Sequence, residues 1–491
     1  MTKETLKILG MKDLNLFREE ACIAGNWSGA ITGEMDDVFN PSTGKLLGRV
    51  PRCGQHETRI AIEAANKAMP AWKATPAKER AKILRRWSEL LVMHKKDLAI
   101  LMTAEQGKPL VESEGEILYA ASFIEWFAEE AKRTYGETIP TNMADRRLLV
   151  IKEGIGVTAA ITPWNFPAAM ITRKAGPALA AGCAMIIKPA PDTPFTALSL
   201  CELGERAGIP KGILSVVTGD AIEIGYELTS NAIVRKMSFT GSTPVGKLLM
   251  KQCSNTVKKL SLELGGNAPF IVFDDADVDK AVQGALDCKF RNAGQTCVSA
   301  NRIMAQESVY DEFTQKLAEG ASKIKVGDGF LKGCQQGPLI NPAALTKVES
   351  HIQDAVEKGA SVLSGGERHI LGGNFLQPTV LGNMKENMLV AREETFGPLA
   401  PVFRFSCEEE ALRMANDTEY GLAAYFFSKD LGRIWRVSEN LEFGIVSINT
   451  GIFSSEAAPF GGMKESGIGR EGSKYGIEEY LEVKYLCMGG I

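Results

Sequence analysis

Histidine and paired cysteine are scarce in this chain. Its 491 residues include four histidines, none in a cluster, and ten cysteines scattered singly without a C-x-x-C pair. These shortages disfavour histidine-based catalysis and a zinc site, and the sequence predicts no metal site. Because isolated cysteines are typical of a reducing compartment, we expect a cytoplasmic protein.

Long apolar runs and an excess of either charge are also absent. No run approaches the ~18 apolar residues of a membrane span, and the first 22 residues carry acids rather than the apolar core of a signal peptide. The net charge of −4, with 45% hydrophobic residues, is ordinary for a soluble globular protein. We therefore expect neither a membrane nor a nucleic-acid partner.

Strand-like and helix-like segments alternate from Val157 onwards. The extended segments GVTAAITP, AMIIKP, GILSVVTG and VRKMSFTG are each followed by a helical pattern. This alternation predicts an α/β fold of βαβ units with a parallel sheet, whose ligands bind at the carboxyl ends of the strands. Asn165, Lys188 and Gly241 come at such ends, and a second α/β pattern follows Glu263.

The remaining segments predict simpler elements. Apolar residues at helical spacing from about Pro76 to Gln106 predict a long packing helix. Residues 136–155 read as a hairpin outside the core, and the C-terminal run EEYLEVKYLCMG alternates like a strand that pairs with this hairpin or with another subunit. The Gly- and Ser-rich residues 451–473 predict a loop.

The segment from Leu262 to Arg302 carries residue types suited to covalent catalysis. Cys297 is a candidate nucleophile, because a thiolate adds readily to a carbonyl carbon. Glu263, beside Gly265 and Gly266, is a candidate general base that activates water. Read singly, the cysteine is as well explained as a small buried hydrophobe, and the glutamate as a strand end.

A glycine-rich turn, Gly241–Lys247, follows the fourth strand and begins a helix. It resembles the phosphate loop G-x-x-x-x-G-K, but Leu248 stands where a nucleotide hydrolase needs Ser or Thr for magnesium. Its backbone N–H groups still suit the pyrophosphate of a dinucleotide. The G-x-G-x-x-G fingerprint is absent from this position.

Three further strand-end or turn residues are candidates for binding. Asn165 lies in the rigid turn PWNFP, where its amide can donate to a developing oxyanion or simply cap the turn. Lys188 and Glu394, the latter followed by Phe396, suit the hydroxyl groups of a ribose. As alternatives, they are a solvated strand-end lysine and the start of a turn.

Taken together, these motifs resemble those of a known family. PWNFP, KPA-x-x-TP, FTGS-x-x-x-G, LELGG, G-Q-x-C, EE-x-FGP and PFGG-x-K-x-SG-x-GRE occur in this order between residues 163 and 471. The set resembles the NAD(P)-dependent aldehyde dehydrogenase superfamily over nearly the whole chain. Within it, FRNAGQTC, NAPFIVFDDAD and GREGSKYGIEEYLE look like the succinate-semialdehyde dehydrogenases.

The resemblance implies a role for each matching residue. Cys297 attacks the aldehyde, Asn165 and the Cys297 backbone N–H hold the oxyanion, and Glu263 activates the water that hydrolyses the thioester. The residues implied at the cofactor are Trp164, Lys188, Pro191, Gly241, Ser242, Gly246, Glu394 and Phe396.

The resemblance also implies a domain organisation. A Rossmann-like cofactor domain comprises residues 1–135 and 156–262, and an α/β catalytic domain comprises residues 263–450. Residues 136–155 and 475–491 form a small β arm for oligomerisation, so a homodimer or homotetramer is expected.

The implied substrate is a small semialdehyde with a carboxylate. The matching residues are Arg173, Arg291 and Ser454, and an arginine presents a planar fork that matches a carboxylate. The succinate semialdehyde of γ-aminobutyrate degradation is the expected substrate. Glutarate semialdehyde is an open alternative, since one methylene changes binding by only ~1–3 kcal/mol. A P-loop nucleotide hydrolase and a structural protein on this fold are less consistent with Leu248 and with the intact Cys297.

The cofactor implied is NADP in preference to NAD. NAD-selective relatives often place an acid three residues after the strand-end lysine, where it binds the ribose 2′-hydroxyl and repels a 2′-phosphate. Pro191 occupies that position, which leaves Lys188 available to the phosphate. Asp192, one residue later, is the acid that can restore repulsion.

Overall fold

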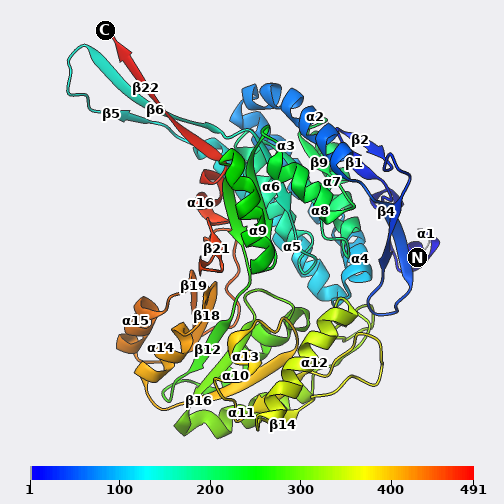
Figure 1. The fold of residues 1–491 in the computed structure, drawn as a ribbon, viewed down its shortest axis with the longest axis vertical. Coiled ribbons are helices and arrows are strands. Elements are labelled where there is room, and N and C mark those ends of the chain that lie inside the picture. The colour runs from blue at the N-terminus through cyan, green and yellow to red at the C-terminus, as the bar shows by residue number, and fades with distance from the viewer. Residues whose placement is uncertain (1–2) are drawn as a thin grey trace.

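Two large β-sheets and a projecting arm make up the protein (Figure 1). The structure is a computed structural model and describes residues 3–491. It confirms the expected α/β class, with both sheets built mainly of parallel strands. Within residues 3–491, no helix is both long and apolar enough to cross a membrane.

The first sheet has eight strands in the order β2-β1-β9-β8-β7-β10-β11-β21. Its parallel strands are β7 (Val157–Ile161), β8 (Ala184–Lys188), β9 (Leu214–Val216), β10 (Val234–Thr240) and β11 (Lys259–Glu263). β1 (Ala21–Ile23), β2 (Asn26–Ser28) and β21 (Gly467–Ile468) complete it. Ile161 pairs with Lys188, and Thr240 pairs with Glu263. The carboxyl ends of these strands therefore meet along one edge.

Helices cover both faces of this sheet, as its buried strands require. α6 (Ala169–Ala180), α7 (Pro194–Ala207), α8 (Ala221–Ser230) and α9 (Thr243–Cys253) follow successive strands. α2 (Gln55–Ala74), α3 (Ala77–Met93), α4 (Lys95–Gln106) and α5 (Leu110–Glu130) add a further layer. The single helix expected from Pro76 to Gln106 was wrong. His94, at φ −96° and ψ 15°, leaves the helical region and separates α3 from α4.

The second sheet has seven strands in the order β14-β15-β16-β13-β12-β18-β19. They are β12 (Ala268–Val272), β13 (Ala300–Gln306), β14 (Ser361–Ser364), β15 (Thr379–Gly382), β16 (Leu399–Phe405), β18 (Ala423–Phe427) and β19 (Ile445–Ile448). The main helices around it are α10 (Val278–Phe290), α11 (Glu307–Ser322), α12 (Pro342–Glu357), α14 (Glu408–Asn416) and α15 (Leu431–Asn440). β19 is one edge of this sheet.

The arm is a three-stranded antiparallel sheet that extends away from the body (Figure 1). β6 (Arg146–Gly154) lies between β5 (Glu137–Ile139) and β22 (Leu481–Gly489). This confirms the expected hairpin and its pairing with the C-terminal strand. The segment 451–473 is not wholly a loop, because β20 (Met463–Lys464) pairs with β17 (Tyr420–Gly421), and β21 pairs with β11.

Candidate active site

Two cavities meet at Cys297, which follows the short 3-10 helix η4 (Arg291–Gly294). One cavity is lined by Trp164, Glu263 and Glu394, and the other, of about 320 Å³, by Arg173, Arg291 and Ser454. Residues far apart in the sequence thus surround one sulfur atom. The arrangement suits a reaction whose two reactants approach the thiol from opposite sides.

The Cys297 thiol lies in an environment that opposes its ionisation. Burial is the main cause that raises its pKa to about 12; the carboxylates of Glu394 and Glu263 contribute to this rise, and the charge of Arg173 opposes it. The thiol must therefore lose its proton against these effects before its sulfur attacks a carbonyl carbon. The loop also packs closely: a Cβ at Gly266 would lie 2.7 Å from the Cys297 carbonyl oxygen, which explains the glycine there.

Glu263 ends β11 and is 3% exposed. Both of its carboxylate oxygens are buried and, among the described residues, have no hydrogen-bond partner. Burial, and then the neighbouring Glu471, raise the pKa of Glu263 well above its usual value. A carboxylate without partners in a dry site is suited to binding and deprotonating a water.

The Asn165 turn is fixed to the loop that carries Cys297. Asn165 Nδ2 donates to the Gln295 carbonyl oxygen at 3.1 Å, and its Oδ1 accepts from the Phe166 backbone N–H at 3.1 Å. Asn165 is 2% exposed and shares the first cavity with Cys297. The amide is therefore held rigidly beside the sulfur, as an oxyanion donor requires.

A buried charged cluster lies next to Glu263. Glu471 forms an ion pair with Arg173 (Nε–Oε2 2.6 Å) and another with Lys174. These two cations hold the pKa of Glu471 below its usual value despite burial. The cluster sets the electrostatic environment of the candidate base.

The second cavity brings together the three residues expected at a substrate carboxylate. Arg173, Arg291 and Ser454 all line it. The Arg173 guanidinium is sandwiched between rings, lying 3.9 Å from the centre of Phe460. Its Nε faces Glu471, whereas its Nη2 is buried and lacks a hydrogen-bond partner within residues 3–491. The Nη2 side of the Arg173 guanidinium is therefore available to a ligand.

The first cavity fits the nicotinamide half of a dinucleotide. Trp164, Gly241, Ser242, Glu394 and Phe396 line it. The Trp164 and Phe396 rings meet edge to face, with centroids 5.5 Å apart. Glu394 accepts the Gly266 N–H at 3.0 Å, and burial raises its pKa to about 7.

Two unsatisfied donors in this cavity support the fit. The Thr240 hydroxyl is buried without a hydrogen-bond partner in the described chain. Ser242 caps α9 with an extended backbone and no side-chain cap bond in the described part of the chain. Free N–H groups at the start of a helix bind phosphate oxygens well.

Three residues expected at the cofactor lie outside this lining. Gly246 is inside α9, where a Cβ would lie 2.5 Å from the Leu264 side chain, so close packing explains the glycine. Lys188 and Pro191 lie at the end of β8, farther along the sheet edge. Burial lowers the pKa of Lys188 to about 8, and the nearby carboxylates of Asp192, Asp36 and Asp220 oppose this shift. Asp192, the acid named as able to restore repulsion of a 2′-phosphate, therefore does interact electrostatically with Lys188.

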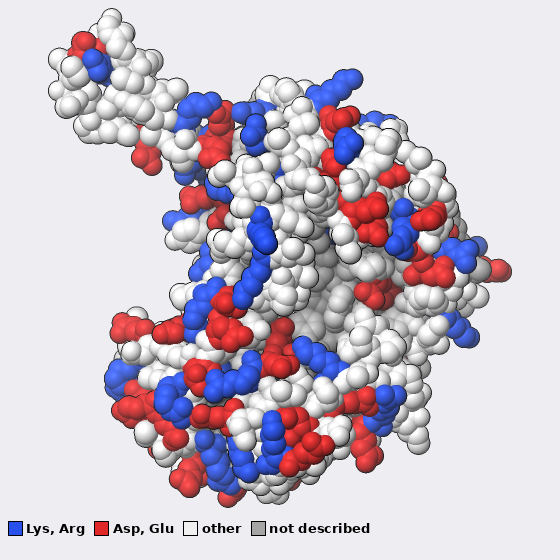
Figure 2. All heavy atoms as spheres, in the orientation of Figure 1, with Lys and Arg blue, Asp and Glu red and all other residues white. Residues whose placement is uncertain are grey.

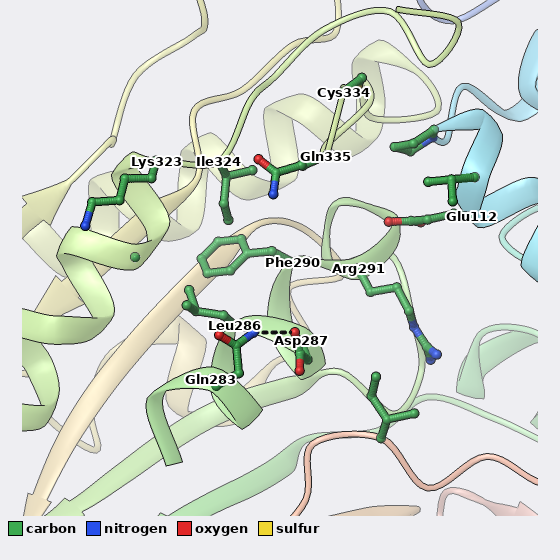
Figure 3. A pocket seen from close by; sticks show the side chains of 14 residues that line it. Glu112, Gln283, Leu286, Asp287, Phe290, Arg291, Lys323, Ile324, Cys334 and Gln335 are labelled. Atoms are coloured by element: carbon green, nitrogen blue, oxygen red, sulfur yellow. Dashed lines mark hydrogen bonds between the residues drawn. The ribbon is translucent and has the colours of Figure 1, made fainter. Parts of the chain in front are cut away.

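An outer hollow adjoins the substrate-side cavity (Figure 3). Both are lined by Glu112, Arg291 and Ile452. Figure 3 shows the Phe290 ring and the Arg291 side chain extending in opposite directions from their shared turn. Arg291 thus separates the outer hollow from the cavity that contains Cys297.

Several residues of the site were not predicted from the sequence. Tyr119 lies on α5, a helix that was not anticipated although apolar residues recur at helical spacing along it. Glu471 is the last residue of the motif GRE, but no role was predicted for it. Lys174 follows Arg173 and offered no signal of its own, since its importance depends on the distant Glu471.

Comparison with known proteins identifies the class. The aldehyde dehydrogenase family profile matches residues 27–486. The chain therefore belongs to the aldehyde dehydrogenase family and is an oxidoreductase.

The similar proteins include semialdehyde dehydrogenases. The chain is 64% identical to the succinate-semialdehyde dehydrogenase [NADP(+)] of Escherichia coli, covering 98% of this chain and 99% of that protein. It is 63% identical to a glutarate-semialdehyde dehydrogenase of Pseudomonas aeruginosa, covering 98% and 100%. The crystal structure of succinate-semialdehyde dehydrogenase from Burkholderia pseudomallei matches at TM-score 0.97 and 62% identity, covering 98% and 100% of the two chains.

Proposed function

We propose that this aldehyde dehydrogenase oxidises succinate semialdehyde to succinate, with NADP used in preference to NAD. The observation that carries the proposal is the pair of arginines, Arg173 and Arg291, on the cavity that ends at Cys297. They match a carboxylate at the far end of a short aldehyde. The names of similar proteins, a succinate-semialdehyde dehydrogenase [NADP(+)] among them, support the same substrate and cofactor.

The proposed reaction begins at Cys297. Its thiolate sulfur attacks the aldehyde carbon, a C–S bond forms, and the carbonyl π electrons move to the oxygen. Asn165 Nδ2 and the Cys297 backbone N–H donate to this oxyanion. A bound oxidised nicotinamide would supply the hydride acceptor. As the oxyanion re-forms the carbonyl and the hydride leaves the carbon, a thioester remains on Cys297.

Hydrolysis of the thioester is assigned to Glu263. Its carboxylate takes a proton from water, whose oxygen attacks the thioester carbon. The C–S bond then breaks to release the acid and the Cys297 thiolate, which takes the proton from Glu263. Glu394 would hold ribose hydroxyls, and Trp164, Phe396 and the α9 N-terminus would hold the rest of the cofactor's nicotinamide half and pyrophosphate.

The preference for NADP is assigned to the end of β8. Pro191 neither accepts a bond from a ribose 2′-hydroxyl nor repels a 2′-phosphate, and Lys188 supplies a cation for the phosphate. Asp192 limits this preference, because its carboxylate acts on the same ammonium. Both cofactors are therefore used, with NADP favoured.

The proposal extends to the assembly. Residues 1–135 and 156–262 form the cofactor domain, residues 263–450 the catalytic domain, and residues 136–155 and 475–491 an oligomerisation arm. β22 is an edge strand with Val483 and Tyr485 exposed, at 66% and 57%, and open edges favour pairing with another copy. A cytoplasmic homodimer or homotetramer acting in γ-aminobutyrate degradation is proposed.

One absorbance assay tests the substrate and the cofactor together. Reduction is followed at about 340 nm with succinate semialdehyde, glutarate semialdehyde and butanal, each with NADP and with NAD. The highest kcat/KM is expected for succinate semialdehyde with NADP. Glutarate semialdehyde is the alternative, supported by the 63% identical relative, and it is distinguished by a higher kcat/KM in the same assay. Butanal oxidised as well as either semialdehyde would contradict carboxylate recognition.

A further inference from the structure

A buried ion pair lies behind the Asn165 turn. Lys108 precedes α5, and Glu116 lies two turns into that helix. Their side chains are each 1% exposed, and Lys108 Nζ is 2.6 Å from Glu116 Oε2. Neither residue has a place in the reaction described above.

Both members of the pair bind the turn that carries Asn165. Lys108 Nζ donates to the Asn165 carbonyl oxygen at 2.7 Å and lies 4.1 Å from the centre of the Phe166 ring. The second oxygen of Glu116 accepts the backbone N–H groups of Ala168 and Ala169, at 2.9 and 3.2 Å. The ion pair therefore holds the PWNFP turn at Asn165 and the backbone directly after it.

The opposite side of Asn165 is attached to the cysteine loop. Asn292 Nδ2 donates to the same Asn165 carbonyl at 3.0 Å, and Asn165 Nδ2 donates to Gln295 O. The Asn165 peptide is thus held between the ion pair and the loop that presents Cys297. Without Lys108, this peptide would lose one of its two donors and could rotate.

We infer that Lys108 and Glu116 are positioning residues, which fix the Asn165 amide where the oxyanion forms. The inference rests on the oxyanion role proposed for Asn165. A buried ion pair contributes little net stability, because desolvation offsets its attraction, and apolar replacements are often neutral or stabilising. Geometry, in contrast, has a large effect on rate: a displacement of ~1 Å can lower it ~100-fold.

The test removes both charges at once, so that no buried charge is left unpaired. In Lys108→Met/Glu116→Gln, the glutamine still accepts the N–H groups of Ala168 and Ala169. The first-turnover rate of cofactor reduction is measured beside the rate of Cys297 alkylation by iodoacetamide, which forms no oxyanion. The first-turnover rate at saturating substrate is expected to fall ~10- to 100-fold, with alkylation nearly unchanged. Saturating substrate is used because Glu116 also lines the substrate-side cavity.

Matched variants separate the possible outcomes. Arg59→Met/Glu227→Gln removes a partly buried ion pair between α2 and α8 and should leave both rates unchanged. Asn165→Ala tests the oxyanion role, and a normal first-turnover rate in this variant would overturn that role. If Asn165→Ala is slow but Lys108→Met/Glu116→Gln is normal, only the positioning role of the ion pair is overturned. A parallel fall of the reduction and alkylation rates in the double variant would also overturn the positioning role. If the double variant does not fold, the single variant Glu116→Gln replaces it, and its ratio of first-turnover reduction rate to alkylation rate is compared with that of the unmodified enzyme.

Discussion

Cys297 and Glu263 both lie where the neutral form of the side chain is favoured. Burial is the main cause for each. The carboxylates of Glu394 and Glu263 also raise the pKa of the Cys297 thiol, and Glu471 also raises the pKa of Glu263. Arg173 opposes the rise at both residues. Since both pKa values are raised, each reactive form increases as pH rises.

Glu263→Gln should separate the two halves of the reaction. The first turnover of hydride transfer remains, while steady-state turnover falls by about 10²–10⁴-fold because the base is lost. The increase of steady-state turnover with rising pH, expected from the raised pKa of Glu263, is also lost. Stopped-flow absorbance and mass spectrometry of the acyl-enzyme check this. Cys297→Ala is the control, and it should form no acyl-enzyme; near-normal turnover of that variant would rule out the nucleophile.

Arg291→Met should weaken the use of charged aldehydes selectively. Arg291 lies 5.6 Å from the Phe166 ring and has no ion pair with any described residue, although its charge acts on the nearby carboxylate of Glu112. Loss of a charge-assisted bond, ~1.5–3 kcal/mol, lowers kcat/KM for succinate semialdehyde by ~10- to 150-fold and leaves butanal little affected. Equal losses for both aldehydes would show a structural arginine.

Arg173→Met should behave differently from Arg291→Met, because Arg173 forms an ion pair with Glu471. Its removal takes a cation from Glu471 and from the surroundings of Glu263, so deacylation of every aldehyde slows in Arg173→Met, with a larger loss for the semialdehyde. The comparison between the two arginine variants, in the same assay, distinguishes substrate binding from electrostatic support.

At the scale of elements, the β8–α7 connection is the one to which we assign the choice of cofactor. Strand β8 ends in Lys188, and the turn after it leaves Pro191 exposed and Asp192 near enough to act electrostatically on the lysine. On the proposed assignment, the choice of cofactor depends on the balance of charges in this short turn, and an added carboxylate is expected to change it.

Pro191→Glu should shift the preference towards NAD, because a carboxylate accepts the ribose 2′-hydroxyl and repels a 2′-phosphate. In the unmodified enzyme, KM for NADP should rise above about pH 8, where Lys188 loses its proton, while KM for NAD changes little. Lys188→Met is the control and should remove this difference. Initial rates at several pH values provide the measurement, and a strong preference of the unmodified enzyme for NAD would contradict the assignment.

At the scale of the whole molecule, the arm is the most exposed part. It extends from the body in Figure 1, and its tip in Figure 2 carries few charged residues. β22 and β19 are each an edge of their sheet. An arm that adds β22 of one copy to β19 of another would cover both edges.

Val483→Lys/Tyr485→Lys should convert the oligomer into monomers, because two exposed apolar side chains two residues apart become charged. Sedimentation velocity measures the change in mass. Ile370→Lys, at a 96% exposed position outside the arm, is the matched control and should leave the mass unchanged. An unaltered oligomer in the arm variant would place the interface elsewhere.

Much of this architecture follows from local sequence patterns. Alternating strands and helices from Val157 predict the parallel sheet, and period-two alternation predicts β22. α5 was missed although apolar residues recur along it at helical spacing, and the α3–α4 break was not predicted because it depends on the backbone angles of one residue, His94. Local patterns do not report such angles.

The sequence alone determined the family and the fold class and singled out Cys297, Glu263 and Asn165 as candidate catalytic residues, because these inferences depend on motifs of contiguous residues. Only the tertiary structure decided which charges surround them. Glu471 reaches Arg173 and Lys174 across almost 300 positions of sequence, and Lys108 reaches Asn165 from another helix layer. Burial and distance set the pKa of each group, and both arise only when distant segments pack together.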